Sequence, residues 1–222
     1  MRPYAQYCPI AKTAEILGDR WTILILRDML VGTRRFNDLA RGLPGISRSL
    51  LTKRLRQLQS SGMVTRSEDG YELTAAGLDL RPLVFSMAAW GAKWAFPDPE
   101  AEDLDPDLLV WWIHGQLDAG LAPGARAVVQ IEFVDRKDAR YWLVVESGDT
   151  SVCLTNPGLD VDIFLRAGLR TMYLVWLGRQ DFGSAVRTGQ IELTGNRQLI
   201  RLFPGWLRFS PVRPAILAAG NG

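Results

Sequence analysis

An acidic, proline-rich stretch near the middle of the chain, PDPEAEDLDPD at 97–107, most constrains how the chain can fold. It holds three prolines and six carboxylates in eleven residues. Proline removes backbone hydrogen-bond donors and like charges repel, so the stretch favours an extended linker. We therefore predict two domains, one over 1–97 and one over 108–222, joined by an acidic linker over 98–107.

The two sides of this stretch differ in charge. Residues 1–97 carry 14 Lys+Arg against 8 Asp+Glu, whereas residues 98–222 carry 12 against 16. A basic domain joined to an acidic one indicates that the first faces an anionic partner. No apolar run approaches the ~18 residues of a membrane-spanning helix, and the N-terminus lacks a secretory signal pattern. We expect a cytoplasmic protein that does not contact a membrane.

Ahead of the linker, apolar residues recur at three and four positions, which predicts a mainly-α domain. Thr33 can cap a short helix through Ala40. Gly42 fits the left-handed position that ends this helix, and Pro44 blocks its continuation. Ser47 can then cap a second helix, which reaches residue 61.

The second helix separates apolar from polar residues. Leu51, Leu55 and Leu58 form one stripe. A separate face, about 140° wide at 100° per residue, carries hydrogen-bond donors: Arg48, Ser49, Thr52, Lys53 and Arg56. Donors on the early turns of the second helix of a helix-turn-helix suit a DNA major groove. An ordinary solvated basic face is the alternative.

A β-hairpin is expected directly after this helix. Asp69-Gly70 lies between MVTRS and YEL, which is a strong short-hairpin signal. Such a hairpin is a wing, and Arg66 on it can reach the phosphate backbone. We predict contacts with double-stranded DNA from seven residues: Arg35, Arg48, Ser49, Thr52, Lys53, Arg56 and Arg66.

These segments resemble the HxlR-type winged helix-turn-helix regulators. The resemblance covers roughly 8–96 and rests on the elements GD-R-W, RF-x-x-L, GIS, L-x-x-RL and Y-x-LT-x-x-G. It implies a homodimeric bacterial transcription regulator. The wing, RSEDGYEL, is shorter than usual and lacks the proline-containing segment common in the family, so the family's wing contacts carry over poorly.

Thr74 can cap a long helix to Phe96, which Pro82 would kink. Apolar side chains recur along it at helical spacing: Leu83, Met87, Trp90 and Trp94. In HxlR-like proteins the terminal helices pair across the two-fold axis, so the resemblance implies a dimer interface here. Packing inside the same domain is the alternative, although a domain of about 90 residues has little interior for such side chains.

Cys8 precedes Pro9, which favours a first helical turn. The positive end of a helix dipole favours the reactive thiolate. Some HxlR-type regulators sense oxidants through a cysteine in this region, which makes Cys8 a redox candidate. The alternative is a small buried apolar residue, since no second cysteine lies nearby in sequence to resolve an oxidised one.

Beyond the linker the pattern predicts an α+β domain. Asp107 can cap an apolar helix, LLVWWIHGQL. Alternating strands follow at 126–135 and 140–147, with Ala127, Val129, Ile131 and Phe133 on one face. Shorter strands are expected at 151–155, VDIFL and GQIELTG, with helices LRTMYLVWLGR and NRQLIRLF. The result is one sheet covered by apolar helices.

This half resembles the sterol carrier protein type 2-like domain over roughly 108–209. The match rests on a strand, a helix, a short G-x-I-x-L-x-G strand and a closing helix. The resemblance implies an apolar cavity for a lipid-like ligand between sheet and helices. Trp142, Met172, Trp176 and Phe203 are the lining candidates; plain core packing is the alternative for each.

Enzymatic function finds little support. The chain has one histidine, His114, and lacks a CxxC pair, a phosphate-binding glycine loop and a nucleophile elbow. We expect no metal and no cofactor. The combined prediction is a dimeric DNA-binding regulator whose second domain binds an apolar effector. A purely structural second domain and a lipid-transfer protein are the alternatives.

Overall fold

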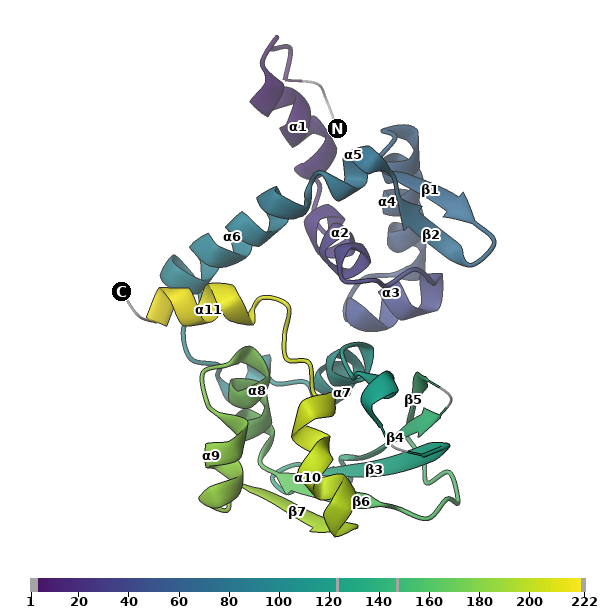
Figure 1. Cartoon of the computed structure of the whole chain (residues 1–222). Helices are drawn as coiled ribbons and strands as arrows, with labels where there is room; N and C mark the ends of the chain where they lie inside the picture. The colour runs from purple at the N-terminus through teal and green to yellow at the C-terminus, as the bar shows by residue number, and fades with distance from the viewer. Residues whose placement is uncertain (1–3, 123, 147, 221–222) are drawn as a thin grey trace. The chain divides into compact units, whose positions relative to one another are not determined.

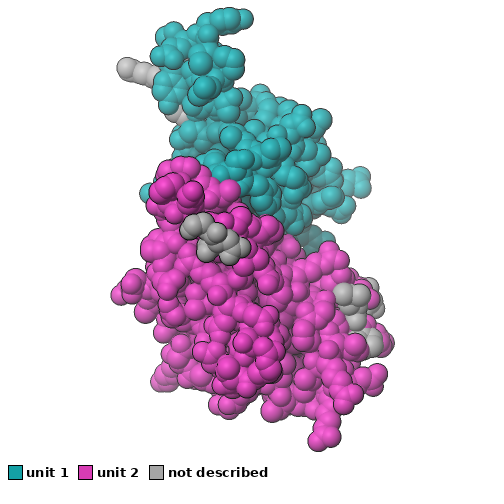
Figure 2. All heavy atoms as spheres, turned by 60° about the vertical axis from the view of Figure 1, so that its left-hand side comes forward, with its two compact units in different colours: residues 1–87 teal, residues 88–222 magenta. Residues whose placement is uncertain are grey.

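Helix α6 (Arg81–Trp94) contains the boundary between two compact units, Met1–Met87 and Ala88–Gly222. Figure 2 colours the first unit teal and the second magenta. The computed structural model describes residues 4–122, 124–146 and 148–220. The unit boundary lies upstream of the acidic stretch at 97–107 because this stretch is folded against the second unit.

The first unit is a winged helix-turn-helix, which confirms the fold predicted for this half (Figure 1). Its elements in chain order are α1 (Pro9–Leu17), α2 (Thr22–Leu30), α3 (Phe36–Gly42), α4 (Arg48–Ser60), β1 (Val64–Ser67), β2 (Gly70–Leu73) and α5 (Ala75–Leu78), followed by the start of α6. The predicted stripe of α4, Leu51, Leu55 and Leu58, is buried against α2 and α3 residues such as Ile25 and Leu39.

Close backbone contact joins the end of the helix-turn-helix to α5. A Cβ atom added at Gly77 in α5 would lie 2.2 Å from the carbonyl oxygen of Met63, so only glycine fits there. Thr74 caps α5 by accepting a hydrogen bond from the Gly77 amide at 3.2 Å. The threonine and glycine of the Y-x-LT-x-x-G element thus fix how α5 leaves the wing.

Several local expectations for this unit need correction. α3 begins at Phe36, not after Thr33, and Gly42 lies inside it; the left-handed glycine is Gly45, at φ 88°. Ser67 pairs with Gly70 across the hairpin, so the turn lies one residue earlier than expected.

The expected single helix over 74–96 is two helices, α5 and α6. Pro82 is the second residue of α6 rather than an interior residue. In the first turn a missing N–H breaks no intrahelical hydrogen bond, so Pro82 begins a helix and kinks none.

The second unit holds a five-stranded mixed sheet with helices (Figure 1). Its elements are η1 (Ala101–Asp103), α7 (Pro106–Gly115), η2 (Ala119–Leu121), β3 (Arg126–Phe133), β4 (Arg140–Glu146), β5 (Asp149–Cys153), β6 (Ile163–Ala167), α8 (Leu169–Leu177), α9 (Phe182–Arg187), β7 (Ile191–Gly195), α10 (Arg197–Trp206) and α11 (Arg213–Gly220). The strand order is β5-β4-β3-β6-β7, in which only β3 and β6 are parallel. Helices α9 and α11 were not anticipated from the sequence.

One face of this sheet packs against the helices and forms the main core. The predicted inward residues of β3, Ala127, Val129, Ile131 and Phe133, are all buried there with residues of α7, α8 and α10. The opposite face carries a smaller cluster of Val128, Trp142 and Val144, against which Leu159 and Val161 of the β5–β6 connection pack.

The acidic stretch is folded, which corrects the prediction of an extended linker. Glu100 and Asp103 cap each other's backbone amides around η1, and Leu104 is buried in the main core. Asp105 caps α7 by accepting from the amides of Asp107 and Leu108, so the cap is Asp105 and not Asp107. Local capping engages Glu100, Asp103 and Asp105, three of the six carboxylates that were expected to repel each other.

Arginines of the second unit fasten the start of this stretch. Arg179 donates to the carbonyl oxygens of Phe96 at 2.6 Å and Pro97 at 3.2 Å, and to the carboxylate of Asp98 at 2.6 Å. Its guanidinium also lies 4.8 Å from the centroid of the Phe96 ring. Arg170 binds the other Asp98 oxygen at 3.1 Å. We call this set of contacts the Arg179 clamp.

Two tyrosines tie α7 to the sheet and to α8. The Tyr141 hydroxyl donates to the Asp107 carboxylate at 2.5 Å, and the Tyr173 hydroxyl donates to the Asp105 carbonyl at 2.9 Å. Burial, reinforced by Asp107, raises the pKa of Tyr141 well above its usual value. Burial raises the pKa of Tyr173 to about 12.

Within the described residues, no helix is both long and apolar enough to cross a membrane.

Candidate nucleic-acid interface

Helix α4 begins where the sequence predicts. The Ser47 side chain accepts a hydrogen bond from the Leu50 amide at 3.2 Å, which satisfies one of the free donors of the first turn. The leucine stripe is buried in the first unit, so the opposite face of the helix is turned outward. Capping and burial together fix which side chains α4 presents.

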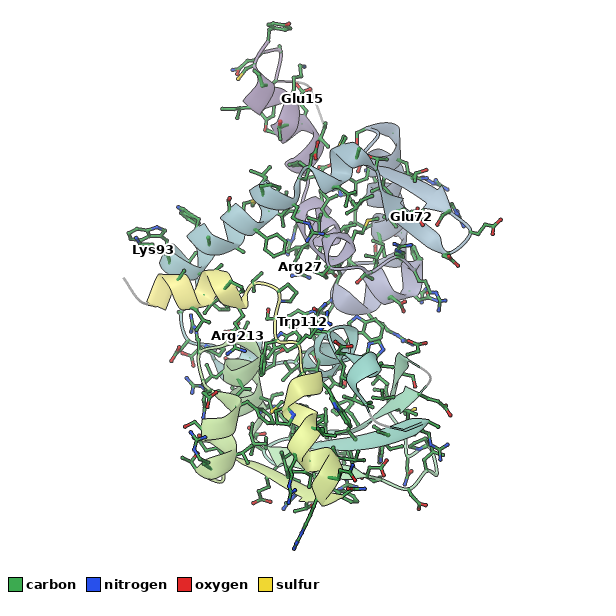
Figure 3. All side chains as sticks on the ribbon, viewed as in Figure 1. Glu15, Arg27, Glu72, Lys93, Trp112 and Arg213 are labelled. Atoms are coloured by element: carbon green, nitrogen blue, oxygen red, sulfur yellow. The ribbon has the colours of Figure 1, made fainter. Side chains whose placement is uncertain are left out.

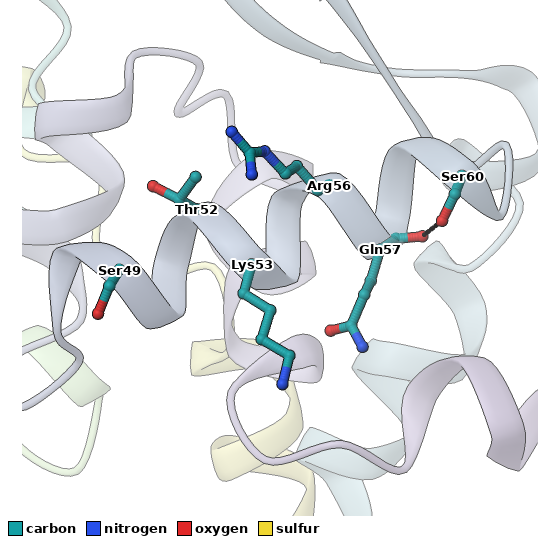
Figure 4. Close-up of a pocket in the computed structure, with 6 residues that line it drawn as sticks. All are labelled: Ser49, Thr52, Lys53, Arg56, Gln57 and Ser60. Carbon is teal, nitrogen blue, oxygen red and sulfur yellow. Dashed lines mark hydrogen bonds between the residues drawn. The ribbon is translucent and has the colours of Figure 1, made fainter. Parts of the chain in front are cut away.

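Six side chains line a shallow, open hollow along this outward face: Ser49, Thr52, Lys53, Arg56, Gln57 and Ser60. Figure 4 shows Ser49, Lys53 and Gln57 in one row and Thr52 and Arg56 in the next. Lys53 and Arg56 are exposed and make no hydrogen bond or ion pair with any residue that the structure describes. Their charges are therefore free to meet an external anion.

Two of the predicted contact residues already have partners in the first unit. The Arg48 guanidinium donates to the Asn37 side-chain oxygen at 3.0 Å and lies 5.7 Å from the Phe36 ring centroid, so it is held over α3. The Thr52 hydroxyl donates to the Arg48 carbonyl at 2.9 Å. This hydroxyl still has lone pairs with which it can accept a hydrogen bond from an external donor.

Arg54, also on α4, faces the other way. Its side chain is only 12% exposed and forms an ion pair with Asp19. It also donates to the Arg20 carbonyl at 3.2 Å and to the Gln57 side chain at 2.8 Å. The arginine of the L-x-x-RL element thus holds α4 against the start of α2 and belongs to the fold, not to the outward face.

The wing is attached to the connection before α3. The Tyr71 amide donates to the Arg34 carbonyl at 2.9 Å, and Arg34 forms an ion pair of 3.2 Å with Glu72, which Figure 3 labels on β2. Arg66 projects from β1 and lies 5.7 Å from the Tyr71 ring centroid. Arg35, at the N-cap of α3, is exposed.

All seven predicted DNA-contact residues therefore lie in the first unit, and all but the half-buried Thr52 are exposed. Gln57 and Ser60 extend the outward face of α4 and were missed. Their positions, four and seven residues after Lys53, continue the same helical row and could have been found from the spacing alone.

Residues 16–99 match the model of the HxlR-like helix-turn-helix proteins. Over 94 residues the chain is 37% identical to an uncharacterized HTH-type transcriptional regulator of Synechocystis, a match that covers 39% of this chain and 70% of that protein. The chain belongs to the HxlR-like helix-turn-helix family. A second relative, the uncharacterized HTH-type transcriptional regulator YybR of Bacillus subtilis, is 33% identical over 96 residues, covering 40% of this chain and 77% of YybR.

Among solved structures, quinone-bound YodB of B. subtilis is 32% identical, with a TM-score of 0.37 and coverage of 39% of this chain and 100% of YodB. The HxlR-like match ends at residue 99, so the family assignment concerns the first unit and the start of the second. The relatives are named as transcriptional regulators and not as enzymes.

The predicted dimer residues share one face of α6 and are all exposed. Their exposed fractions are 42% for Leu83, 48% for Met87, 63% for Trp90 and 67% for Trp94. Four large apolar side chains are thus exposed at helical spacing on one face of α6.

Cys8 is the N-cap residue of α1 and is half-buried, and its side chain makes no capping hydrogen bond.

His114 lies at the end of α7. Its Nε2 atom is 2.8 Å from the Thr150 carbonyl oxygen, and its ring stacks on the Trp111 ring with 4.8 Å between the ring centroids. Within the described ranges, no three His, Cys, Asp or Glu side chains are grouped to hold a metal ion.

Three of the four predicted ligand-lining residues share the main core, and the fourth lies on the other face of the sheet. Met172, Trp176 and Phe203 are buried in the main core between sheet and helices, with exposed fractions of 2%, 4% and 0%. Trp142 lies on the opposite face of the sheet, in the small cluster with Val128. A surface hollow of about 360 Å³ next to Trp142 is lined mainly by charged residues of β3, of β4 and of the turn between them.

Proposed function

We propose that this HxlR-like chain regulates transcription by binding double-stranded DNA through the outward face of α4. The observation that carries the proposal is the pair Lys53 and Arg56, exposed and without partners among the described residues, on a helix that Ser47 and the buried leucine stripe hold in place. Arg48, Ser49 and Thr52 lie on the same face, and Arg35 and Arg66 flank it. Basic side chains in the major groove can read guanine edges, while hydroxyls suit phosphates or base edges.

The test is DNA binding by Arg56→Ala and Lys53→Ala proteins, first on sheared genomic DNA to select a site and then on that site by fluorescence anisotropy. A base-reading side chain should, when removed, relax preference at one position by ~1–3 kcal/mol, whereas a phosphate contact should weaken all sequences and reduce the salt slope by about one. Lys12→Ala is the matched control, since Lys12 is an exposed cation on α1 paired with Glu15. Binding by both α4 variants that equals wild type would contradict the proposal.

We further propose a homodimer formed through α6, with two copies of α4 reading half-sites about one helical turn, ~10 bp, apart in a pseudo-palindrome. The exposed apolar face of Leu83, Met87, Trp90 and Trp94 supports this. Trp90→Glu should give a monomer in sedimentation and weaken operator binding. Ala89→Glu adds the same charge at an exposed position of α6 that lies away from this face, and should leave the dimer intact. Dimeric Trp90→Glu protein would refute this interface.

For the second unit, Ala88–Gly222, we propose a fold that resembles sterol carrier proteins and binds an apolar effector. A sheet with helices packed on one face is compatible with this. The tight packing of Met172, Trp176 and Phe203 favours the alternative of a structural domain. Native mass spectrometry before and after organic extraction separates the two. A reproducible small apolar molecule supports an effector; an empty protein that takes up no fatty acid supports the alternative.

Redox sensing by Cys8 is a second candidate regulation, supported by its position as the half-buried N-cap residue of α1, where its thiol makes no capping hydrogen bond. Cys8→Ser protein should then bind DNA equally with and without hydrogen peroxide, while wild-type binding changes. Equal behaviour of both proteins would exclude this role.

A further inference from the structure

The end of the second unit departs from the charge of the rest of that unit. Residues 98–192 carry 8 Lys+Arg against 16 Asp+Glu. No acidic residue follows Glu192, and residues 193–222 carry four arginines: Arg197, Arg201, Arg208 and Arg213. An acidic unit therefore ends in a basic segment.

The fold accounts for two of these arginines. Arg208 forms an ion pair with Asp118, and the Arg213 guanidinium lies 4.2 Å from the Phe209 ring centroid. Arg197 and Arg201, in contrast, are exposed on α10 and have no hydrogen bond, ion pair or ring contact with the residues that the structure describes. They need another explanation.

Their position on α10 is electrostatically unfavourable. Arg197 is the first residue of the helix, at the positive end of its dipole, and the first turn contains no acidic residue. Arg201 lies four residues on, one turn and about 6 Å along the axis, where two like charges repel. Two arginines that weaken their own helix, with no partner among the described residues, are not explained by the stability of the fold.

A polyanion that needs no apolar contact fits these two residues. The apolar face of α10, with Leu199, Phe203 and Trp206, is buried in the main core, so the helix has no such face to insert into a lipid bilayer. Only Leu202, 44% exposed, remains near the arginines among the described residues of α10. Arginine is suited to phosphate because its planar guanidinium donates two parallel hydrogen bonds.

We propose that Arg197 and Arg201 form a second DNA-contact strip, which binds backbone phosphates and adds sequence-independent affinity to that of α4. The proposal rests on the proposed DNA-binding function of the chain. It gives the second unit a direct role on DNA in addition to any effector binding. We call the two residues the α10 strip.

The test is the salt dependence of binding by the full-length Arg197→Ala/Arg201→Ala protein to a labelled mixed-sequence duplex. The slope of log K against log salt, measured between about 50 and 200 mM, falls by about 0.9 for each phosphate that the protein no longer neutralises, so by roughly 1.8 per protomer. Arg126→Ala/Lys137→Ala is the matched control. It removes two exposed positive charges from the same unit that also lack ion-pair partners among the described residues, and its slope should equal that of wild type.

Two further readouts separate binding from folding. Arg197→Lys/Arg201→Lys should restore the slope, because counterion release counts charges. The melting temperature of the double alanine variant should be no lower than that of wild type, because it loses two unfavourable charges. A variant that binds DNA less well while being at least as stable is the signature expected of the α10 strip.

An unchanged slope in the double alanine variant would overturn the proposal, and so would an equal fall in the control, which would mean that only net charge matters. Weaker binding to anionic phosphatidylserine vesicles with unchanged DNA binding would also overturn it. The Lys53→Ala/Arg56→Ala protein, measured in parallel, distinguishes failure of the α10 strip from failure of the proposed DNA binding by α4. A fall only in this α4 variant refutes the α10 strip alone, whereas a fall only in the α10 variant refutes the role of α4.

Discussion

Replacing Arg54 by methionine should destabilise the first unit without removing any DNA contact. The side chains of Arg54 and Asp19 are 12% and 27% exposed, so their ion pair is partly buried. A surface ion pair contributes ~0.2–1 kcal/mol, and disruption of a buried pair costs ~3–5 kcal/mol, so the cost here should lie between these values. Three acceptors, on Asp19, Arg20 and Gln57, lose their donor. Methionine retains the apolar stem, so the loss of hydrogen bonding dominates and we expect about 2–3 kcal/mol.

For a unit of about 90 residues this corresponds to a fall in melting temperature of roughly 10–20 °C. Amide hydrogen exchange in α2 and α4 of the full-length protein, measured in increasing urea, reports the first unit separately from the second. Arg56→Met is the control: Arg56 lies two residues further on and is exposed, so the free energy of unfolding should change by less than about 0.5 kcal/mol while DNA affinity falls.

The two arginines should therefore have opposite phenotypes. If Arg54→Met proved as stable as Arg56→Met, the ion pair with Asp19 would contribute nothing and the reasoning would fail. Loss of DNA affinity in Arg54→Met protein with unchanged stability would place Arg54 among the DNA-contact residues. In Asp19→Ala protein the Arg54 substitution should cost less than in wild type, because the two residues share one interaction.

Gly77→Ala should destabilise the protein, because the new Cβ would lie 2.2 Å from the Met63 carbonyl oxygen. A Cβ at Gly91 would meet nothing within 4 Å, so Gly91→Ala should stabilise α6 by about 0.5–1 kcal/mol. Urea unfolding midpoints of the two variants test both predictions. Tyr173 should ionise near pH 12 in ultraviolet titration. Because its folded pKa lies above the unfolded value, its contribution to stability is complete below pH ~10 and is lost as pH rises towards 12. Arg179→Ala should cost about 1–3 kcal/mol and increase amide exchange around residues 96–98, unlike the exposed Arg187→Ala.

Features that depend on neighbouring residues were predictable from the sequence. Ser47 and the leucine stripe specify α4 through local capping and helical spacing, and the structure confirms both. The outward face of α4 follows from the same spacing. Where two local signals compete, local rules are less decisive: Asp105 and Asp107 can both cap α7, and the cap is the one that directly precedes Pro106.

Features that depend on pairing across the chain were not predictable. The acidic stretch was predicted to be an extended linker, and the arginines that hold its start, Arg170 and Arg179, lie more than 70 residues away in sequence. Strand register is also decided at a distance. Val129 pairs with Leu143, so Trp142 points to the face away from Met172. Every residue from Tyr141 to Val145 is buried, so alternation along β4 does not reveal this register.

The Arg179 clamp also determines where the chain can be divided by genetic engineering. A fragment that starts at Leu108 would leave Arg170 and Arg179 without the backbone carbonyls and carboxylate that they bind, and it would expose the Leu104 site of the core. A soluble fragment for crystallisation should start no later than Ala88, where the second unit begins. A chimera that exchanges this half between two regulators should carry Phe96, Pro97 and Asp98 with it, because these residues recognise their own arginines.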